Sequence, residues 1–187
     1  REYPQVRAGL ILMMDRTFDR RLNEVIVEKA LGWASRGIVG IDIAGPRPGG
    51  RYPYRELAPL VDEARASGLG VTIHVGEEGS TGLEEIGEVV EVLRPDRIGH
   101  GILAAGDAAL MTQLRELGIV LEICPTSNLL TKALPDEDAV RETFRRFVEH
   151  EVAFTIATDG PEMMHTHLRD ELALLHRIGA LDADELA

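Results

Sequence analysis

Residues 69–77 read "LGVTIHVGE", and this stretch decides the fold because it is a short apolar run bounded by glycine. Val71, Ile73 and Val75 alternate with Thr72 and His74, a pattern typical of a strand covered by other elements. The run ends at Gly76 and Glu77, which are followed by more polar residues and glycine. The stretch therefore predicts a buried strand that places an imidazole and a carboxylate at its carboxyl end.

Five more runs of this kind occur along the chain, separated by segments long enough for a helix. These strand candidates are "AGLILMM" (8–14), "GIVGIDIAG" (37–45), "DRIGHG" (96–101), "GIVLEICP" (118–125) and "VAFTIATDG" (152–160). Six strand–helix units in tandem, without a break in composition, predict a single α/β domain over residues 1–187. The segment 44–54, "AGPRPGGRYPY", is interpreted as a long loop of the kind that often contributes to a binding site.

The segments between the strands have apolar residues at helical spacing. The predicted buried faces are Leu22, Val25, Ile26 and Trp33; Leu57, Leu60, Val61 and Ala64; Leu83, Ile86, Val89, Val90 and Leu93; Leu110, Leu114 and Leu117; Val140, Phe144, Phe147 and Val148; and Leu168, Leu172 and Leu175. Thr81 and Glu84 form a capping-box pattern before the third helix, and Gly37, Gly68 and Gly118 occupy C-cap positions. The sequence therefore predicts six amphipathic helices with defined ends.

Composition and charge restrict the class of partner. Hydrophobic residues make up 44% of the 187 residues and aromatic residues only 4%, which predicts a globular protein with a mainly aliphatic core. The formal net charge of −12 argues against nucleic acid or an anionic membrane surface as a partner.

Cysteine usage and the chain start bear on location. The single cysteine, Cys124, excludes an internal disulfide and a cysteine-based zinc site, and it indicates a reducing compartment, so we expect a cytoplasmic protein. No apolar run approaches the roughly 18–20 residues of a membrane span. The chain starts at Arg1 without a signal-peptide pattern, and the missing methionine is interpreted as a processed product or part of a longer protein.

Polar residues gather where the predicted strands end. His74 and Glu77, His100, the segment 122–128, and Asp159 all lie at or just after a carboxyl end, where α/β folds build their sites. Taken alone, each has an ordinary structural interpretation. A strand histidine can be a hydrogen-bonded core residue, and Asp159 before Pro161 can be a helix N-cap. Together they favour one functional constellation.

The motifs "GIDIAG", "HVGEEG", "RIGHG", "LEICPTSN" and "TDGP" resemble, in order and approximate spacing, those of the adenosine deaminase family of metal-dependent amidohydrolases. The similarity runs from about Val6 to about Leu175. It implies a TIM-type (β/α)8 barrel holding one Zn²⁺ ion, here an incomplete barrel of about six βα units. It also implies a deaminase that releases ammonia from a 6-aminopurine nucleoside or a related compound.

The resemblance implies a role for five residues. His74 matches a zinc ligand, and Glu77 matches the acid that protonates the purine ring nitrogen N1. His100 matches the histidine beside the metal-bound water, and Asp159 matches an aspartate that ligates zinc and helps to hold that water. Gly45 matches the glycine whose backbone contacts the purine. A carboxyl group walled in by apolar residues can stay protonated, as the role of Glu77 requires.

The sequence departs from the family in two places. The family's first strand carries a His-x-His pair of zinc ligands, and no such strand is present. The only such pair, His165 and His167, follows Pro161 into a predicted helix, where residues two apart point in different directions, so we interpret both as surface residues. Gly160 replaces a second aspartate that many members place against the purine, which argues against plain adenosine and leaves aminodeoxyfutalosine, adenine and an N6-substituted purine open as substrates.

Two other functions remain as alternatives. One is a different amidohydrolase reaction, such as ester, lactone or amide hydrolysis. The other is a truncated, metal-free barrel that only binds or packs, with exposed sheet edges that favour association into a homo-oligomer. Cys124 has no adjacent base in the sequence, so we interpret it as a small buried residue before a proline turn.

Overall fold

The computed structural model of the protein describes residues 5–46, 52–79 and 82–186. The strands are β1 (Leu10–Asp15), β2 (Ile38–Ala44), β3 (Gly70–Val75), β4 (Arg97–His100), β5 (Val120–Ile123) and β6 (Phe154–Ile156). The α-helices are α1 (Arg20–Gly32), α2 (Tyr54–Ala66), α3 (Gly82–Leu93), α4 (Ala108–Leu117), α5 (Pro125–Leu130), α6 (Glu137–Glu149), α7 (Pro161–Met164) and α8 (Leu168–Arg177). Two 3₁₀ helices, η1 (Ala34–Arg36) and η2 (Ile102–Gly106), complete the described elements.

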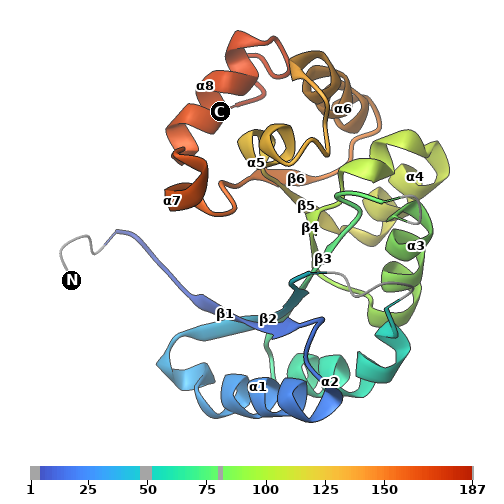
Figure 1. The fold of residues 1–187 in the computed structure, drawn as a ribbon, viewed down its shortest axis with the longest axis vertical. Coiled ribbons are helices and arrows are strands. Elements are labelled where there is room, and N and C mark those ends of the chain that lie inside the picture. The colour runs from blue at the N-terminus through green and yellow to red at the C-terminus, as the bar shows by residue number, and fades with distance from the viewer. Residues whose placement is uncertain (1–4, 47–51, 80–81, 187) are drawn as a thin grey trace. The chain divides into compact units, whose positions relative to one another are not determined.

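The chain divides into two compact units, each described here by itself. The first comprises the residues up to His74 together with Glu88–Asp96. In it β2 pairs in parallel with β1 and with β3, in a register that sets Asp15 opposite Ala44 and Ile43 opposite Ile73. Figure 1 shows α1 and α2 side by side along the same side of β1 and β2. This pairing brings the carboxyl ends of three strands to one edge of the sheet.

The second unit comprises Val75–Gly87 and Arg97–Ala187. Here β5 pairs in parallel with β4 and β6, and α5 contacts α6, α7 and α8 (Figure 1). Its core contains Phe144, whose ring lies edge-on to that of Phe154 with centroids 5.3 Å apart. The carboxyl ends of these three strands again share one edge, which fixes where their following loops start.

The six predicted strands are confirmed, each somewhat shorter than its apolar run. The alternation of parallel strands and helices confirms the α/β class. The prediction of a single domain over residues 1–187 stays a prediction. Of the predicted helix ends, Gly118 is the left-handed C-cap of α4, whereas Thr81 and the middle of the 44–54 loop lie outside the described residues.

The predicted buried face of α1 is wrong. Leu22 and Trp33 are exposed, while Asn23, Val27 and Ala30 are buried. These three also follow helical spacing, and the buried Asn23 side chain bonds both the amide and the carbonyl of Asp15 at the end of β1. Asn23 is buried because its side chain provides hydrogen bonds to the backbone at the end of β1, whereas the prediction from apolar residues had placed Leu22 on the buried face.

Most of the other predicted faces are confirmed. All four residues predicted for α2 are buried, as are Ile86, Val89, Val90 and Leu93 of α3. The outermost predicted residues are exposed, namely Leu83, Leu117 and Leu168. The short helix α5 was not predicted, whereas α7 begins at Pro161, as the sequence indicated; both have proline in the first turn, where the missing N–H costs nothing. None of the helices in the described part of the chain is long and apolar enough to cross a membrane.

Candidate active site

In the first unit, a buried carboxylate holds the predicted metal-ligand histidine. Nδ1 of His74 on β3 lies 2.8 Å from Oδ2 of Asp42 on β2. Asp42 is 6% exposed, whereas about a third of the His74 side chain is exposed. A carboxylate on one ring nitrogen fixes the tautomer and direction of an imidazole and is the usual support of a metal-binding histidine.

Arg16 connects the strand ends of this unit. It follows β1, is 7% exposed, and its guanidinium donates hydrogen bonds to the carbonyls of Gly45 (2.8 Å), Ile43 (3.4 Å) and His74. A guanidinium presents several N–H donors in one plane, so a single side chain can fasten two strand ends at once. Arg16 therefore fixes the backbone at both Gly45 and His74.

Gly45 occupies a position that only glycine fills easily. Its φ is +90°, and a Cβ there would lie 2.9 Å from Oδ1 of Asp15. Hydrogen bonds from the Thr17 side chain and amide lower the pKa of Asp15, so this carboxylate is charged at neutral pH. A side chain at position 45 would therefore collide with this carboxylate, which explains the glycine, and the substrate-binding role of Gly45 stays a prediction.

The second unit brings Glu77 and His100 together. Nε2 of His100 lies 3.6 Å from Oε2 of Glu77. Oε1 of Glu77 accepts hydrogen bonds from Asn128 Nδ2 (3.3 Å) and Thr131 Oγ1 (3.2 Å). Asn128 Nδ2 also lies 3.1 Å from His100 Nδ1. The predicted proton donor and the predicted histidine therefore belong to one hydrogen-bonded cluster.

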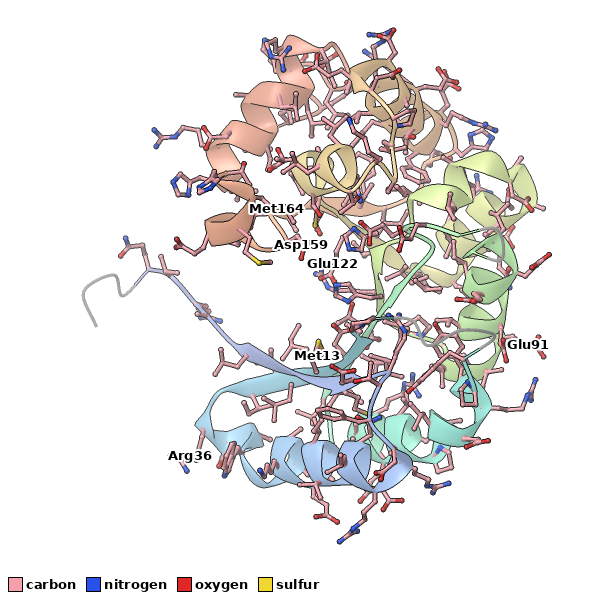
Figure 2. The ribbon with its side chains drawn as sticks, in the orientation of Figure 1. Met13, Arg36, Glu91, Glu122, Asp159 and Met164 are labelled. Atoms are coloured by element: carbon pink, nitrogen blue, oxygen red, sulfur yellow. The ribbon has the colours of Figure 1, made fainter. Side chains whose placement is uncertain are left out.

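Asp159 lies just after β6 and is held by α5. Its Oδ2 accepts a hydrogen bond of 2.7 Å from Oγ of the fully buried Ser127. The alternative interpretation of Asp159 as a helix N-cap is wrong, because the N-cap of α7 is Gly160. Figure 2 labels Asp159, and near it Met164 of α7, in this unit. The carboxylate is left exposed and available for a ligand.

His100 and Asp159 share an uncommon backbone conformation. Their φ angles are +61° and +57°, in the left-handed region that side chains other than glycine seldom occupy. Such strain costs about 1–3 kcal/mol per residue and gathers at functional sites. Two predicted site residues thus have a strained backbone conformation, and this conformation sets the direction of their side chains.

A buried glutamate supports α5, the helix that carries Ser127 and Asn128. Glu171 on α8 has no exposed surface, and its carboxylate accepts hydrogen bonds from Thr126 N (2.9 Å) and Thr166 Oγ1 (2.7 Å). A carboxylate at the first turn satisfies a helix N–H that lacks an intrahelical partner. Glu171 therefore fixes the start of the helix from which both side chains project.

Cys124 has the properties of a structural residue. Burial, and next the negative charge of Asp159, raise the pKa of its thiol to about 12. A thiol with this pKa is almost entirely protonated at neutral pH, so it is a poor nucleophile. The sequence-based interpretation of Cys124 as a small buried residue agrees with this position.

The predicted metal ligands belong to different units, His74 to the first and Asp159 to the second. Their sharing of one zinc ion, and the five assigned site roles, stay predictions. Within residues 5–46, 52–79 and 82–186, no group of three or more histidine, cysteine or acidic residues is arranged to hold a metal ion. His165 is the C-cap of α7 and His167 is the N-cap of α8, so the helix that starts at Pro161 ends before His165. Both histidines are exposed surface residues, as predicted.

Sequence reasoning gave no individual role to four polar residues that support the predicted ones, namely Arg16, Asp42, Ser127 and Asn128. A signal was present for three of them. Asp42 is the single acid in the apolar run "GIVGIDIAG", and Ser127 and Asn128 close the motif "EICPTSN". Nothing local marked Arg16, because its partners are backbone carbonyls distant in the sequence.

The family model for adenosine deaminase matches residues 3–187. The chain is 35% identical over 184 residues to an adenine deaminase of Rhizobium rhizogenes, a match covering 96% of this chain and 55% of that protein. It is 38% identical over 169 residues to an aminodeoxyfutalosine deaminase of Acidothermus cellulolyticus, covering 86% of this chain and 46% of that protein.

Among solved structures, the N6-methyl-AMP deaminase of Arabidopsis thaliana in its apo form superposes with a TM-score of 0.82 at 29% identity, covering 95% of this chain and 50% of that one. The chain belongs to the adenosine deaminase family. It spans about half the length of the curated relatives it matches. The predicted family and the predicted fold class, an incomplete barrel of βα units, are both confirmed.

Proposed function

We propose that the protein to which this chain belongs is a zinc-dependent hydrolytic deaminase that replaces the exocyclic amine of a 6-aminopurine by oxygen and releases ammonia. The single observation that supports it most is the contact between half-buried Glu77 and buried His100 at the carboxyl ends of adjacent βα units. Membership in the adenosine deaminase family supports the same reaction class. A cytoplasmic location and a homo-oligomeric state belong to the proposal as well.

Glu77 is the proposed proton donor. Attack on an aromatic ring carbon requires a more electrophilic ring, and a proton given from a Glu77 oxygen to purine N1 supplies this. Two donors, Asn128 and Thr131, bind Oε1 of Glu77, and they fix the direction in which the carboxyl group faces while Oε2 lies toward His100. The proposal thus assigns to Glu77 the general acid of the reaction.

Asp159 and His100 are the proposed partners of the attacking water. The Asp159 carboxylate accepts the proton that the water gives up, and Ser127 of α5 holds one oxygen of that carboxylate by a hydrogen bond. His100 orients the water from its buried, strained position. Gly45, held by Arg16, offers backbone groups to the purine.

His74 and Asp159 are the proposed zinc ligands of this chain. The Asp42–His74 contact fits a metal-binding histidine, and imidazole with carboxylate is a donor set that zinc accepts. When bound, zinc would supply the Lewis acidity that makes water a nucleophile at neutral pH. Two ligands hold a metal more weakly than a complete set, so we expect this chain alone to bind zinc weakly.

The substrate is proposed only as a class. Relatives named as adenine deaminases and as aminodeoxyfutalosine deaminases have similar identity to the chain. The solved N6-methyl-AMP deaminase adds a nucleotide with a substituted amine. A Cβ at Gly160 would lie 3.0 Å from Cε of Met163, so an apolar side chain lies beside this position, and a purine with a less polar edge fits this better than one that needs a carboxylate there.

The test is ammonia release by the full-length protein with added zinc, on adenine, adenosine, aminodeoxyfutalosine and N6-methyl-AMP. The N6-methylated compound is followed as methylamine. We expect turnover of at least one compound and none after zinc removal. A zinc-loaded protein that hydrolyses ester or lactone substrates but no aminopurine would instead support the alternative amidohydrolase reaction.

A further inference from the structure

We propose that Asn128 is a positioning residue that sets the tautomer of His100 and, with the same amide, fixes the carboxyl group of Glu77. The proposal rests on the function proposed above and adds to it a residue with no assigned role. Asn128 touches no substrate in this account and acts through the two residues that do.

One amide nitrogen makes both contacts. Nδ2 of Asn128 lies 3.1 Å from Nδ1 of His100 and 3.3 Å from Oε1 of Glu77. An amide NH₂ group has two N–H donors and no acceptor capacity, so each contact uses one donor. The side chain therefore bridges the two groups that the reaction depends on.

The position of this amide is rigid. Asn128 has no exposed surface, its backbone N–H donates to Cys124 O (2.9 Å), and its backbone carbonyl accepts from Leu134 N (2.9 Å). Its Oδ1 is buried and has no hydrogen-bond partner among the described residues. Burying an unpaired carbonyl oxygen costs about 1–3 kcal/mol, so the contacts of Nδ2 alone determine the orientation of the amide.

This geometry determines which nitrogen of His100 carries the proton. Because Nδ1 receives an N–H from Asn128, it must present a lone pair, and the proton of the neutral ring is then on Nε2. Nε2 is the nitrogen that faces Oε2 of Glu77 at 3.6 Å. Asn128 thereby places the ring proton of His100 on the nitrogen nearest to Glu77.

The nitrogen-15 spectrum of the imidazole rings tests this directly. In histidine-labelled protein, the unprotonated ring nitrogen resonates far downfield of the protonated one, and His100 is assigned by the signals lost in His100→Gln. We expect the Nε2–H pattern in the unmodified chain. We expect Asn128→Asp, nearly identical in shape but able only to accept, to move the proton to Nδ1.

Two further variants control the result. Asn23→Asp places the same charge at another buried asparagine, whose side chain bonds the backbone of Asp15, and should leave the His100 pattern unchanged. Asn128→Leu removes the donor without adding an acceptor and should let the two neutral ring forms coexist in place of Nε2–H alone. An Nδ1–H pattern in the unmodified chain would overturn the proposal, and this result does not depend on the folding of any variant. A His100 pattern that stays the same in Asn128→Asp would also overturn it.

The activity of the full-length protein gives a second measurement. Asn128→Asp should lower kcat at least about 10²-fold, within the range of general acid–base catalysis, with a much smaller change in KM. A loss confined to KM would contradict a positioning role. If the unmodified protein released ammonia from none of the purines, the proposed function would fail, while the ring spectrum would still decide the tautomer.

Discussion

Ser127 Oγ donates a 2.7 Å hydrogen bond to Oδ2 of Asp159, a residue 32 positions further along the chain. The serine has no exposed surface, whereas the carboxylate is open to solvent. A rigid donor at the base of an accessible carboxylate restrains one oxygen and leaves the other for a ligand. The first prediction concerns this pair.

Ser127→Ala should lower the free energy of unfolding by about 1–2 kcal/mol, because a buried hydrogen bond to a carboxylate is lost. Denaturant unfolding of the chain measures this. Thr112→Ala, which removes an exposed hydroxyl bonded to a helix carbonyl, is the matched control and should change stability much less. Equal effects of the two substitutions would show that the contact with Asp159 contributes no stability.

Glu77→Gln should reduce turnover by the full-length protein at least about 10²-fold while its metal content stays the same, because the amide cannot donate the proton that the ring needs. Ammonia release and metal analysis of the same sample check both parts. Retained activity in this variant would mean that Glu77 is not the proton donor.

Asp42→Asn should weaken zinc binding about 10–100-fold, the usual effect of removing the carboxylate behind a ligating histidine. The reason is the 2.8 Å contact with Nδ1 of His74, which an amide does not reproduce as a charged acceptor. Competition with a chromogenic chelator measures the affinity. Asp62→Asn, on the exposed face of α2, serves as the control and should leave the affinity unchanged.

Gly76→Ala should destabilise the second unit. Gly76 has φ +70°, and a Cβ there would lie 2.3 Å from Cδ1 of Ile86. We expect a loss of about 1–3 kcal/mol, as for other forced overpacking, measured by thermal or denaturant unfolding. Gly87→Ala is the matched control, since a Cβ on that helical residue meets nothing within 4 Å and should stabilise by about 0.5–1 kcal/mol.

The Cys124 thiol should make stability fall as pH rises above 9. Burial raises its pKa from 9.0 to about 12, so between these values the folded chain keeps a proton that the unfolded chain releases. Its stabilising contribution is therefore complete below pH 9 and is lost as pH rises toward 12. Denaturant unfolding from pH 8 to 10, compared with Cys124→Ala, measures the effect. Equal pH dependence in both proteins would contradict it.

Much of this organisation could be predicted from local patterns. Apolar runs located all six strands, because parallel strands are buried along most of their length. Periodicity failed on α1, where the polar side chain of Asn23 takes an inner position through its bonds to Asp15. Short helices such as α5 have too few residues for periodicity to show.

The reactive side chains of the candidate site could be predicted from the sequence, whereas the residues that hydrogen-bond to them could not. His74, Glu77, His100 and Asp159 stand out because polar residues follow apolar strands. Their partners depend on contacts between distant segments, such as Asn128 with Glu77, which lie 51 positions apart. Family resemblance supplied roles for the first set of residues, whereas only the coordinates assigned partners to them.

The left-handed backbone at His100 and Asp159 has a consequence for protein engineering. Glycine adopts this conformation without penalty, so His100→Gly and Asp159→Gly remove strain that the present side chains impose. The same changes remove the contacts of Asp159 with Ser127 and of His100 with Asn128, so thermal robustness reflects a balance between a relaxed backbone and lost contacts. A screen for robustness alone would measure that balance and would not register the loss of the reactive groups.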